Sequence, residues 1–150
     1  MNISAQQIKE LREKTGAGVS DIKRALEESG GDMAKAEAAI EKKLGSAAFK
    51  RAGRETRAGV METYIHANRR IGVLIHISCE TDFVARNPEF RGVAHDIAMQ
   101  IAAMDPVDVS ALQVQPYIKD GGKSVGDILN ETIGRFGENI KIEKFARYEI

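Results

Sequence analysis

The stretch Cys79–Asn87 joins an alternating apolar segment to an amphipathic one, and it carries the side chains best suited to chemistry, Asp82 and Phe83. A short connection between two rigid elements often holds functional side chains, because the scaffold fixes its position while it stays exposed. An exposed aromatic ring can anchor in a partner's pocket, and an adjacent carboxylate can compete for a cation held there. In the alternative, Thr81 caps a helical turn while Phe83 and Val84 pack into the core. Residue types alone leave both interpretations open.

The histidines and the single cysteine do not form a catalytic or metal-binding pattern. His76 and Cys79 are an odd number of positions apart in one predicted strand, so their side chains point to opposite faces. His95 is expected on the solvent side of a helix and His66 at the end of a hairpin. We therefore predict no catalytic residue, no metal site and no enzymatic activity.

The glycine-rich motifs that bind nucleotide phosphates are absent from the sequence. It contains neither G-x-x-x-x-G-K-[ST] nor a G-x-G-x-x-G that opens a helix after a strand. The partial match at Gly121–Ser124 is interpreted as the turn that starts a helix. We expect no direct nucleotide binding and no cofactor.

Composition and charge narrow the class of partner. The 150 residues include 22 Lys plus Arg and 22 Asp plus Glu, so the chain has no general attraction for nucleic acid or an anionic membrane. An aromatic content of 5% without tryptophan provides few stacking platforms for single-stranded RNA. No stretch reaches the ~20 apolar residues of a membrane helix, and one cysteine cannot form an internal disulfide. These features predict a cytoplasmic protein.

Helical signals fill the N-terminal third of the chain. Ser4 and Gln7 have the spacing of a capping box, which predicts a first helix from about Ala5. Gly16 suits the C-terminal cap of that helix. The glycine-rich loop Thr15–Gly18 looks like that of a ubiquitin-associated-type bundle, and small bundles of this kind usually bind a partner.

Two further helices follow this loop. The second ends at Gly30–Gly31, and Asp32 caps a third helix that we expect to end at Gly45. The sequence therefore predicts a three-helix domain at residues 1–45.

A basic stretch follows at residues 46–58. It carries four cations opposed only by Glu55, namely Lys50, Arg51, Arg54 and Arg57. We interpret it as a partly helical, solvated linker. The alternative is an electrostatic contact with an acidic partner or with RNA.

From Val60 the hydrophobic period changes from that of a helix to that of a strand. Met61, Thr63 and Ile65 alternate with their polar or aromatic neighbours, and residues 67–70 read as a hairpin connection. The second strand places one set of side chains on a single face: Ile71, Val73, Ile75, Ile77 and Cys79. That face requires a covering helix.

The covering helix is predicted directly after Asn87, which is a good N-cap and is followed by Pro88. Asp105–Pro106 ends it. Its apolar stripe consists of Phe90, Val93, Ala94, Ile97, Ala98, Ile101 and Met104.

The C-terminal part is predicted as a loop, a helix and a strand. Residues 107–122 read as irregular, Ser124 caps a helix closed by Gly137, and a strand runs from Ile140. One face of that strand is expected to carry the side chains of Ile140, Ile142, Ala146, Tyr148 and Ile150. Lys144 interrupts this apolar face, so we expect a bulge or an edge position. The fold class is α+β, with a core domain at residues 59–150 in which helices cover a small antiparallel sheet of about three strands.

Two long motifs and one short run are distinctive. The first motif is Leu11-Arg12-x-x-Thr15-Gly16-Ala17-Gly18, followed by Asp21-x-Lys23-x-Ala25-Leu26 and Gly31-Asp32; the second is Thr81–Asn87, and the short run is Gly137–Ile140. Together they resemble the motifs of bacterial elongation factor Ts.

The resemblance implies a guanine-nucleotide exchange factor for elongation factor Tu that does no covalent chemistry. It implies that the three-helix domain docks on the GTPase through Arg12, Gly16, Ala17, Gly18, Val19 and Ser20. It also implies that Thr81, Asp82, Phe83 and Val84 insert beside the partner's magnesium site and help to dislodge the ion.

The chain departs from the family pattern in two places. Val19-Ser20 stands where two methionines are common, which makes the docking surface smaller and partly polar. Several helices that are usual between Met104 and Gln115 are missing, and a single half-core remains. Short family members pair into dimers, so a homodimer stays open. The alternative function is a ribosome- or RNA-associated adaptor that uses the three-helix domain and the basic linker.

Overall fold

The computed structural model describes residues 3–150 and begins with three helices, α1 (Ala5–Thr15), α2 (Val19–Glu28) and α3 (Met33–Arg51). We call these the helical unit. The capping box at Ser4 is confirmed, since its Oγ accepts from the Gln7 amide at 3.2 Å and the Gln7 side chain accepts from the Ser4 amide at 2.9 Å. Gly16 closes α1 in the left-handed conformation, with φ 67°. Eight buried residues form the core of this unit: Leu11, Ala17, Ile22, Ala25, Leu26, Ala36, Ile40 and Leu44.

The predicted end of the third helix at Gly45 is wrong. Helix α3 runs for 19 residues, from Met33 to Arg51. The first part of the stretch 46–58 is therefore helical, as expected, but it is the end of this third helix and not a separate element. The buried stripe of α3 continues past Gly45 with Ala48, because this part of the helix packs against the rest of the molecule. Tertiary packing outweighs the low helix propensity of one glycine.

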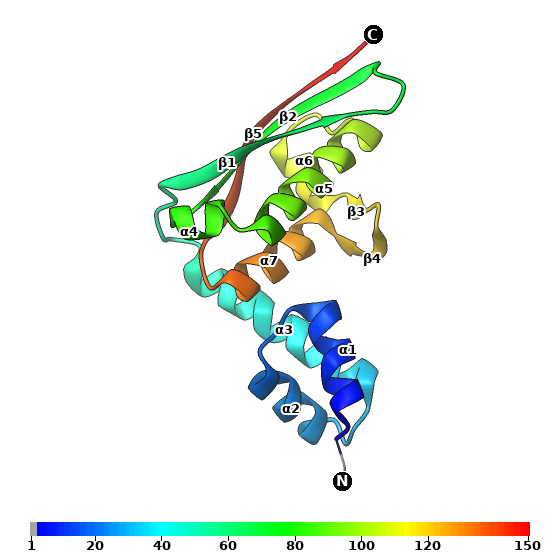
Figure 1. The fold of residues 1–150 in the computed structure, drawn as a ribbon, viewed down its shortest axis with the longest axis vertical. Helices are drawn as coiled ribbons and strands as arrows, with labels where there is room; N and C mark the ends of the chain where they lie inside the picture. The colour runs from blue at the N-terminus through cyan, green and yellow to red at the C-terminus, as the bar shows by residue number, and fades with distance from the viewer. Residues whose placement is uncertain (1–2) are drawn as a thin grey trace.

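The second part of the chain is built on a sheet of β1 (Ala58–Ile65), β2 (Ile71–Cys79) and β5 (Ile140–Glu149) in the order β1-β2-β5, all antiparallel. Helices α5 (Pro88–Met104) and α7 (Val125–Phe136) lie on the same side of this sheet (Figure 1). We call this part, with α4 to α7, the core. The predicted α+β fold with a three-stranded antiparallel sheet is confirmed.

The sheet has a covered face and an open face. Val73, Ile75 and Ile77 of β2 are buried on the covered face, as predicted. In β1, however, Val60 and Tyr64 pack against the core, whereas Met61 and Ile65 are exposed. Register explains this, because Met61 lies opposite His76 and shares its side of the sheet.

The bulge expected in the last strand is present at the edge of the sheet, but the single phase predicted for that strand is wrong. His76 pairs with Lys144 while Ile77 pairs with Ile142, so Glu143 is the extra residue. Ile140 and Ile142 are buried before the bulge. After the bulge the alternation inverts. Phe145 and Arg147 then lie opposite Ile75 and Val73 on the covered face, and Tyr148 lies on the open one.

Helix α5 covers the sheet as predicted, with two differences. Met104 is 47% exposed, and Gln100 is fully buried on the inner side. The Gln100 side chain donates to the Pro116 carbonyl at 3.1 Å and accepts from the Ile118 amide at 2.8 Å. These bonds satisfy a buried amide and tie α5 to the next segment.

The irregular loop predicted at residues 107–122 contains regular elements. A short helix, α6 (Val109–Val114), is capped by Asp108, and β3 (Pro116–Tyr117) pairs with β4 (Asp120–Ser124). The short lengths of these elements hid their periodicity. Ser124 then starts α7 with a capping box to Asp127, and Gly137 closes α7 with φ 70°, both as predicted.

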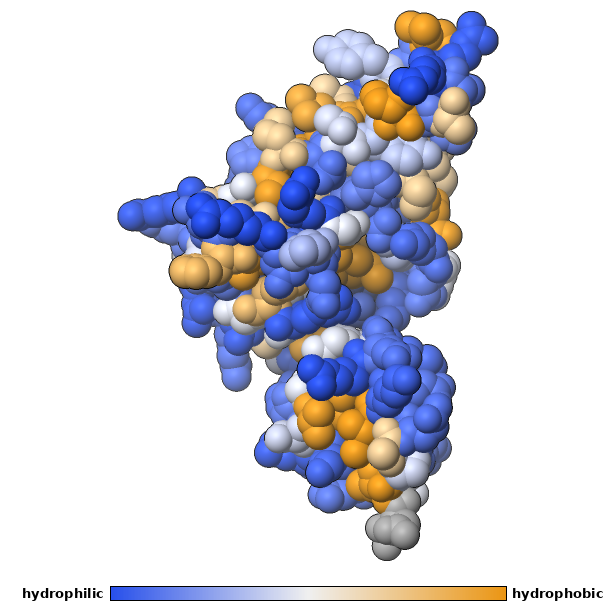
Figure 2. Space-filling view, viewed as in Figure 1, coloured by the Kyte–Doolittle hydropathy of each residue, from blue (hydrophilic) through white to orange (hydrophobic). Residues whose placement is uncertain are grey.

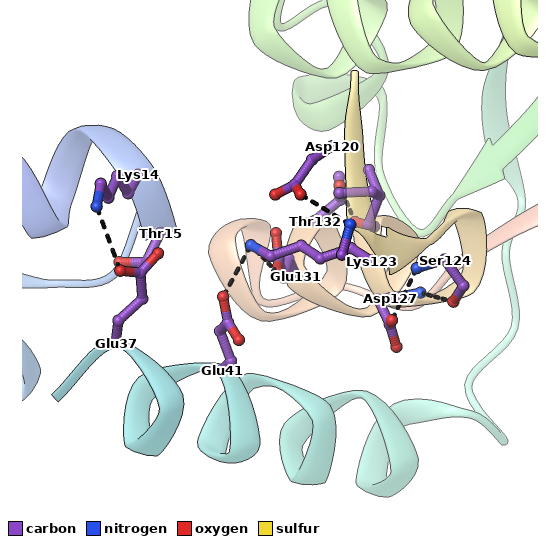
Figure 3. Close-up of polar contacts among 12 residues, drawn as sticks. Lys14, Thr15, Glu37, Glu41, Asp120, Lys123, Ser124, Asp127, Glu131 and Thr132 are labelled. Atoms are coloured by element: carbon purple, nitrogen blue, oxygen red, sulfur yellow. Dashed lines mark hydrogen bonds and ion pairs between the residues drawn. The ribbon is translucent and has the colours of Figure 1, made fainter. Parts of the chain in front are cut away.

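The helical unit joins the core where α3 packs on α7. The Lys123 Nζ atom lies 2.8 Å from Glu41 on α3 and 2.8 Å from Glu131 on α7 (Figure 3). At Gly134, an added Cβ would lie 2.9 Å from the Leu44 Cβ, so the glycine permits the close approach of the two helices. The division at residues 45 and 58 into separate domains stays a prediction.

Candidate functional site

The segment Thr81–Val84 forms the start of a single helical turn, α4 (Asp82–Ala85), between β2 and α5. We call it the exposed turn. The Thr81 side chain caps α4, with its Oγ1 accepting from the Val84 amide at 3.4 Å. Asn87 caps α5, with its Oδ1 accepting from the Glu89 amide at 2.8 Å. Two helix caps six residues apart therefore fix where the turn begins and ends.

The exposed turn has an outer and an inner side. Phe83 is 88% exposed and Asp82 is exposed, whereas Val84 is only 8% exposed and belongs to the hydrophobic core. The alternative in which both Phe83 and Val84 pack into the core is therefore wrong for Phe83 and correct for Val84. The sheet and α5 complete their core without the phenyl ring, which leaves it free to contact a partner.

Glu138 holds the N-terminal end of the exposed turn from across the molecule. Its Oε1 accepts from the amides of Glu80 and Thr81 at 3.1 and 3.0 Å, and its Oε2 accepts from the Thr81 hydroxyl at 2.6 Å. Sequence reasoning singled out Glu138 only as part of a motif and gave it no role. The signal available was a carboxylate directly after the glycine that ends α7.

Cys79 lies directly beneath the exposed turn and is fully buried. Its thiol donates to the Thr81 carbonyl at 3.2 Å. Burial, together with the negative charge of Glu138, raises the pKa of the Cys79 thiol from 9.0 to about 11. The thiol is a structural group at neutral pH, because its thiolate is scarce.

The second group of predicted site residues surrounds the loop between α1 and α2. The loop is held by Thr15, whose hydroxyl donates to the Leu11 carbonyl at 2.6 Å and accepts from the Ala17 amide at 3.2 Å. Ala17 is buried and supports the loop from inside. The exposed members of the predicted set are Arg12, Gly18, Val19 and Ser20, with Gly16 partly exposed.

The two groups of predicted residues are separate in the structure, and the start of the α1–α2 loop lies across a cleft from the N-terminus of α5. A shallow cleft is lined by Arg12 and Gly16 on one side and by Glu89, Arg135 and Phe136 on the other. Glu89 begins α5, only a few residues after the exposed turn. Figure 2 shows this face of the molecule, with apolar atoms of the helical unit also gathered between α1 and α2.

The basic stretch is broken up by ion pairs. Arg54 lies 3.6 Å from Glu80, and Arg57 lies 2.6 Å from Glu55. Lys50 and Arg51 end α3. Two of the four cations thus have carboxylate partners, which lowers the local positive charge available to an RNA backbone.

Two of the three histidines, His66 and His95, lie on the surface beside Tyr64, whereas His76 is partly buried in β2 opposite Met61. The Tyr64 hydroxyl is 3.0 Å from His66 Nδ1, and the Tyr64 ring makes an edge contact with His95. Within residues 3–150, no group of three or more His, Cys, Asp and Glu side chains is placed to hold a metal ion. None of the helices in that range is both long and apolar enough to cross a membrane.

Known proteins resemble this chain over nearly its whole length. The family model described as Elongation factor TS matches residues 80–150. Elongation factor Ts of Desulforamulus reducens is 42% identical, over 99% of this chain and 89% of that protein. Elongation factor Ts of Rubrobacter xylanophilus is 39% identical, over all of both chains, and that of Thermotoga maritima is 42% identical, over all of this chain and 97% of the relative.

These alignments are longer than the chain itself. They span 193 to 195 positions, whereas this chain has 150 residues, so part of each relative has no counterpart here. In the structure α5 ends at Met104 and α6 begins at Val109, with only a short connection between them. This is consistent with the shortened segment inferred between Met104 and Gln115.

Proposed function

Because this chain belongs to the elongation factor Ts family of translation elongation factors, we propose that it is a guanine-nucleotide exchange factor for elongation factor Tu. In this proposal it binds the GDP-bound GTPase and promotes GDP release by dislodging Mg²⁺, so that GTP can rebind during translation elongation. It works in the cytoplasm, by binding alone, with no covalent chemistry and no cofactor of its own.

The observation that supports the proposal most directly is the outward position of Phe83 on a turn whose inner residue is buried. The Phe83 ring is 88% exposed while the next residue, Val84, is buried, so the ring can meet a partner's pocket without any rearrangement of the hydrophobic core. Val84 anchors the turn in the core, so the ring does not have to be ordered at the moment of docking. We therefore assign the partner contacts of this segment to Thr81, Asp82 and Phe83, with Val84 as their support.

The proposed mechanism relies on the role of Mg²⁺ in nucleotide affinity. The ion bridges phosphate oxygens and offsets their negative charge, so its loss removes a large part of the free energy of GDP binding. Insertion of Phe83 would displace the partner groups around the ion, and the Asp82 carboxylate would compete for it. Binding of the factor and binding of GDP must weaken each other equally, which makes the exchange reversible when GTP arrives.

The helical unit supplies the second contact in this proposal. Arg12, Gly18, Val19 and Ser20 are exposed around the loop between α1 and α2 and can meet the GTPase surface. Gly16 and Ala17 shape that loop from within. One contact holds the partner while the other acts at its ion, which is the division of labour that an exchange factor needs.

The test is a measurement of nucleotide release. Elongation factor Tu loaded with a fluorescent GDP is mixed with excess unlabelled GDP, with and without this protein, and the loss of fluorescence is followed. We expect release to be accelerated at micromolar protein, and the acceleration to fall as free Mg²⁺ is raised from micromolar to millimolar. An unchanged release rate at every concentration of the protein would refute the proposed function.

A further inference from the structure

The exposed turn is held mostly by bonds from outside itself. Helix α4 is a single turn of four residues, and the capping bond from Thr81 Oγ1 to the Val84 amide is long at 3.4 Å. A helical turn of this length has almost no stability of its own. Its C-terminal half is fixed by burial of Val84 and Ala85, which leaves its N-terminal half to be fixed by other groups.

Glu138 supplies the hydrogen bonds that fix the N-terminal half of the exposed turn. Its carboxylate accepts three hydrogen bonds, two from the backbone amides of Glu80 and Thr81 and one from the Thr81 hydroxyl. A carboxylate offers about four lone-pair sites, so most of its capacity is used on this one segment. Bonds to an ionised acceptor are also stronger than those between neutral groups.

Glu138 is itself held in a fixed position. Gly137 turns the chain at the end of α7, and the next residue, Asn139, is 2% exposed. The Asn139 amide N–H donates to the Glu80 carboxylate at 2.7 Å, which reciprocates the bond from Glu80 N–H to Glu138. The two segments 80–81 and 138–139 therefore clamp each other through both backbone and side chains.

The clamp extends to the connection from the helical unit. The Asn139 side chain donates to the carbonyls of Ala52 and Arg54 at 3.3 and 2.8 Å, directly after the end of α3. Arg54 also lies 3.6 Å from the Glu80 carboxylate. The exposed turn, the end of α7 and the exit from α3 thus meet at one network.

From this geometry we infer that Glu138 is a positioning residue for exchange: it holds the exposed turn in the conformation that presents Phe83 to the partner. The inference rests on the exchange function proposed above. Glu138 acts through Thr81 and does not need to touch the GTPase. By ordering the turn before docking, it lowers the conformational entropy that the turn would lose on binding.

Two substitutions at Glu138 test the role in exchange. Glu138→Ala removes the acceptor for three donors, and we expect the accelerated GDP release to slow by about tenfold, because the turn is then no longer ordered before docking. Glu138→Gln keeps an oxygen for both amides and can donate to Thr81 Oγ1, so it should stay within about twofold of the unmodified protein. Glu55→Ala is the matched control, because it removes the same charge from an exposed carboxylate paired with Arg57.

A double-mutant cycle with Phe83→Ala separates positioning from general loss of structure. If Glu138 acts by presenting the ring, Glu138→Ala should slow release by less than about twofold in a chain that already carries Phe83→Ala. A general loss of folded protein would instead reduce exchange by the same factor in both backgrounds. Equal factors would therefore overturn the inference.

Amide hydrogen exchange gives a readout that does not depend on the GTPase. In Glu138→Ala the Glu80 and Thr81 amides should lose protection by at least tenfold, while those of Ile75 and Ile77 in β2 keep theirs. Glu138→Gln should retain protection at all four positions. Unchanged amide protection of Glu80 and Thr81 in Glu138→Ala, or GDP release as slow with Glu138→Gln as with Glu138→Ala, would refute the positioning role.

The same set of measurements distinguishes failure of this inference from failure of the proposed function. If the unmodified protein does not accelerate GDP release, the exchange function is refuted, and with it the purpose assigned to Glu138. Suppose instead that the unmodified protein accelerates GDP release and that Phe83→Ala loses this effect. If Glu138→Ala then accelerates GDP release as much as the unmodified protein does, only the positioning role is refuted.

Discussion

Neighbouring residues in the exposed turn face opposite surroundings, and this contrast makes the exchange proposal testable. Phe83 is exposed and Val84 is buried, although the two side chains are adjacent in sequence and similar in hydrophobicity. Their contributions to stability and to partner binding should therefore differ sharply.

The first prediction concerns this pair. Phe83→Ala should change the melting temperature by less than about 2 °C, because little buried surface is lost, while slowing stimulated GDP release at least tenfold, as expected for an aromatic anchor. Val84→Ala should lower the free energy of unfolding by roughly 1–3 kcal/mol through a cavity in the core. Circular dichroism melts and the fluorescent GDP assay measure the two effects. A large fall in melting temperature for Phe83→Ala would contradict the outward position of the ring.

The second prediction concerns the thiol beneath the turn. Because Cys79 is fully buried, and burial raises the pKa of its thiol from 9.0 to about 11, the folded protein should react with a thiol reagent at pH 8 at least about a hundredfold more slowly than the denatured chain. A group whose pKa is raised on folding contributes stability below its ordinary pKa that is lost as pH rises. The free energy of unfolding should thus fall between pH 9 and 11, and less so in Cys79→Ala. Equal reaction rates in the folded and denatured states would contradict the assignment.

At the scale of elements, two glycines in helices have opposite roles. Gly45 lies within α3 with no atom within 4 Å of where a Cβ would stand, so it only lowers helix propensity. Gly134 lies in α7, where a Cβ would press on the Leu44 side chain of α3. The contact between α3 and α7 therefore requires a glycine at position 134 and does not require one at position 45.

The third prediction compares alanine at these positions. Gly45→Ala should raise the free energy of unfolding by about 0.5–1 kcal/mol, the usual gain in helix propensity. Gly134→Ala should lower it by roughly 1–3 kcal/mol despite the same gain, because overpacking forces α3 away from α7. Urea denaturation of both variants measures the difference. The outcome that would contradict this interpretation is stabilisation by both substitutions.

At the scale of the whole molecule, the ion pairs around Lys123 bridge the helical unit and the core. Lys123 and Glu131 are 19% and 12% exposed, so both charges are largely removed from water. Burial disfavours the charged lysine, but its hydrogen bonds to Glu131 and Glu41 prevail and raise the pKa of Lys123. Burial raises the pKa of Glu131, and the lysine opposes that rise.

The fourth prediction follows from removal of this lysine. In Lys123→Ala the pKa of Glu131 should rise further, because the lysine that opposes the rise is gone. When the pKa of a carboxyl is higher in the folded than in the unfolded state, the folded state becomes less stable as pH rises. The variant should therefore be destabilised by about 1–3 kcal/mol at pH 7.5 and by clearly less at pH 5. Lys35→Ala, in which an exposed pair with Asp32 is lost, should change stability by less than about 0.5 kcal/mol at either pH. Denaturation curves at the two pH values measure both variants, and a pH-independent loss would contradict the role of Glu131.

Features that depend on local chemistry could be predicted from the residues alone. The caps at Ser4, Asp32, Asn87 and Ser124, the closing glycines Gly16 and Gly137, and the buried face of β2 were all predicted from spacing alone. Such features are decided within a few residues, because a cap or an alternating strand satisfies its own hydrogen bonds or pattern. The segment proposed to act on the partner was located for the same reason, since it lies between two such elements.

Features that depend on contacts between distant segments could be learned only from the folded structure. Helix α3 continues through Gly45 because α7 covers its next turns, and the phase of β5 inverts after Glu143 because its register is set against β2. The bonds that the Thr81 amide and hydroxyl donate to Glu138 join parts of the chain more than fifty residues apart. The outward direction of Phe83 likewise depends on how the turn sits on the folded core. No local pattern encodes such contacts, because their free energy arises only when the sheet and helices bring the segments together.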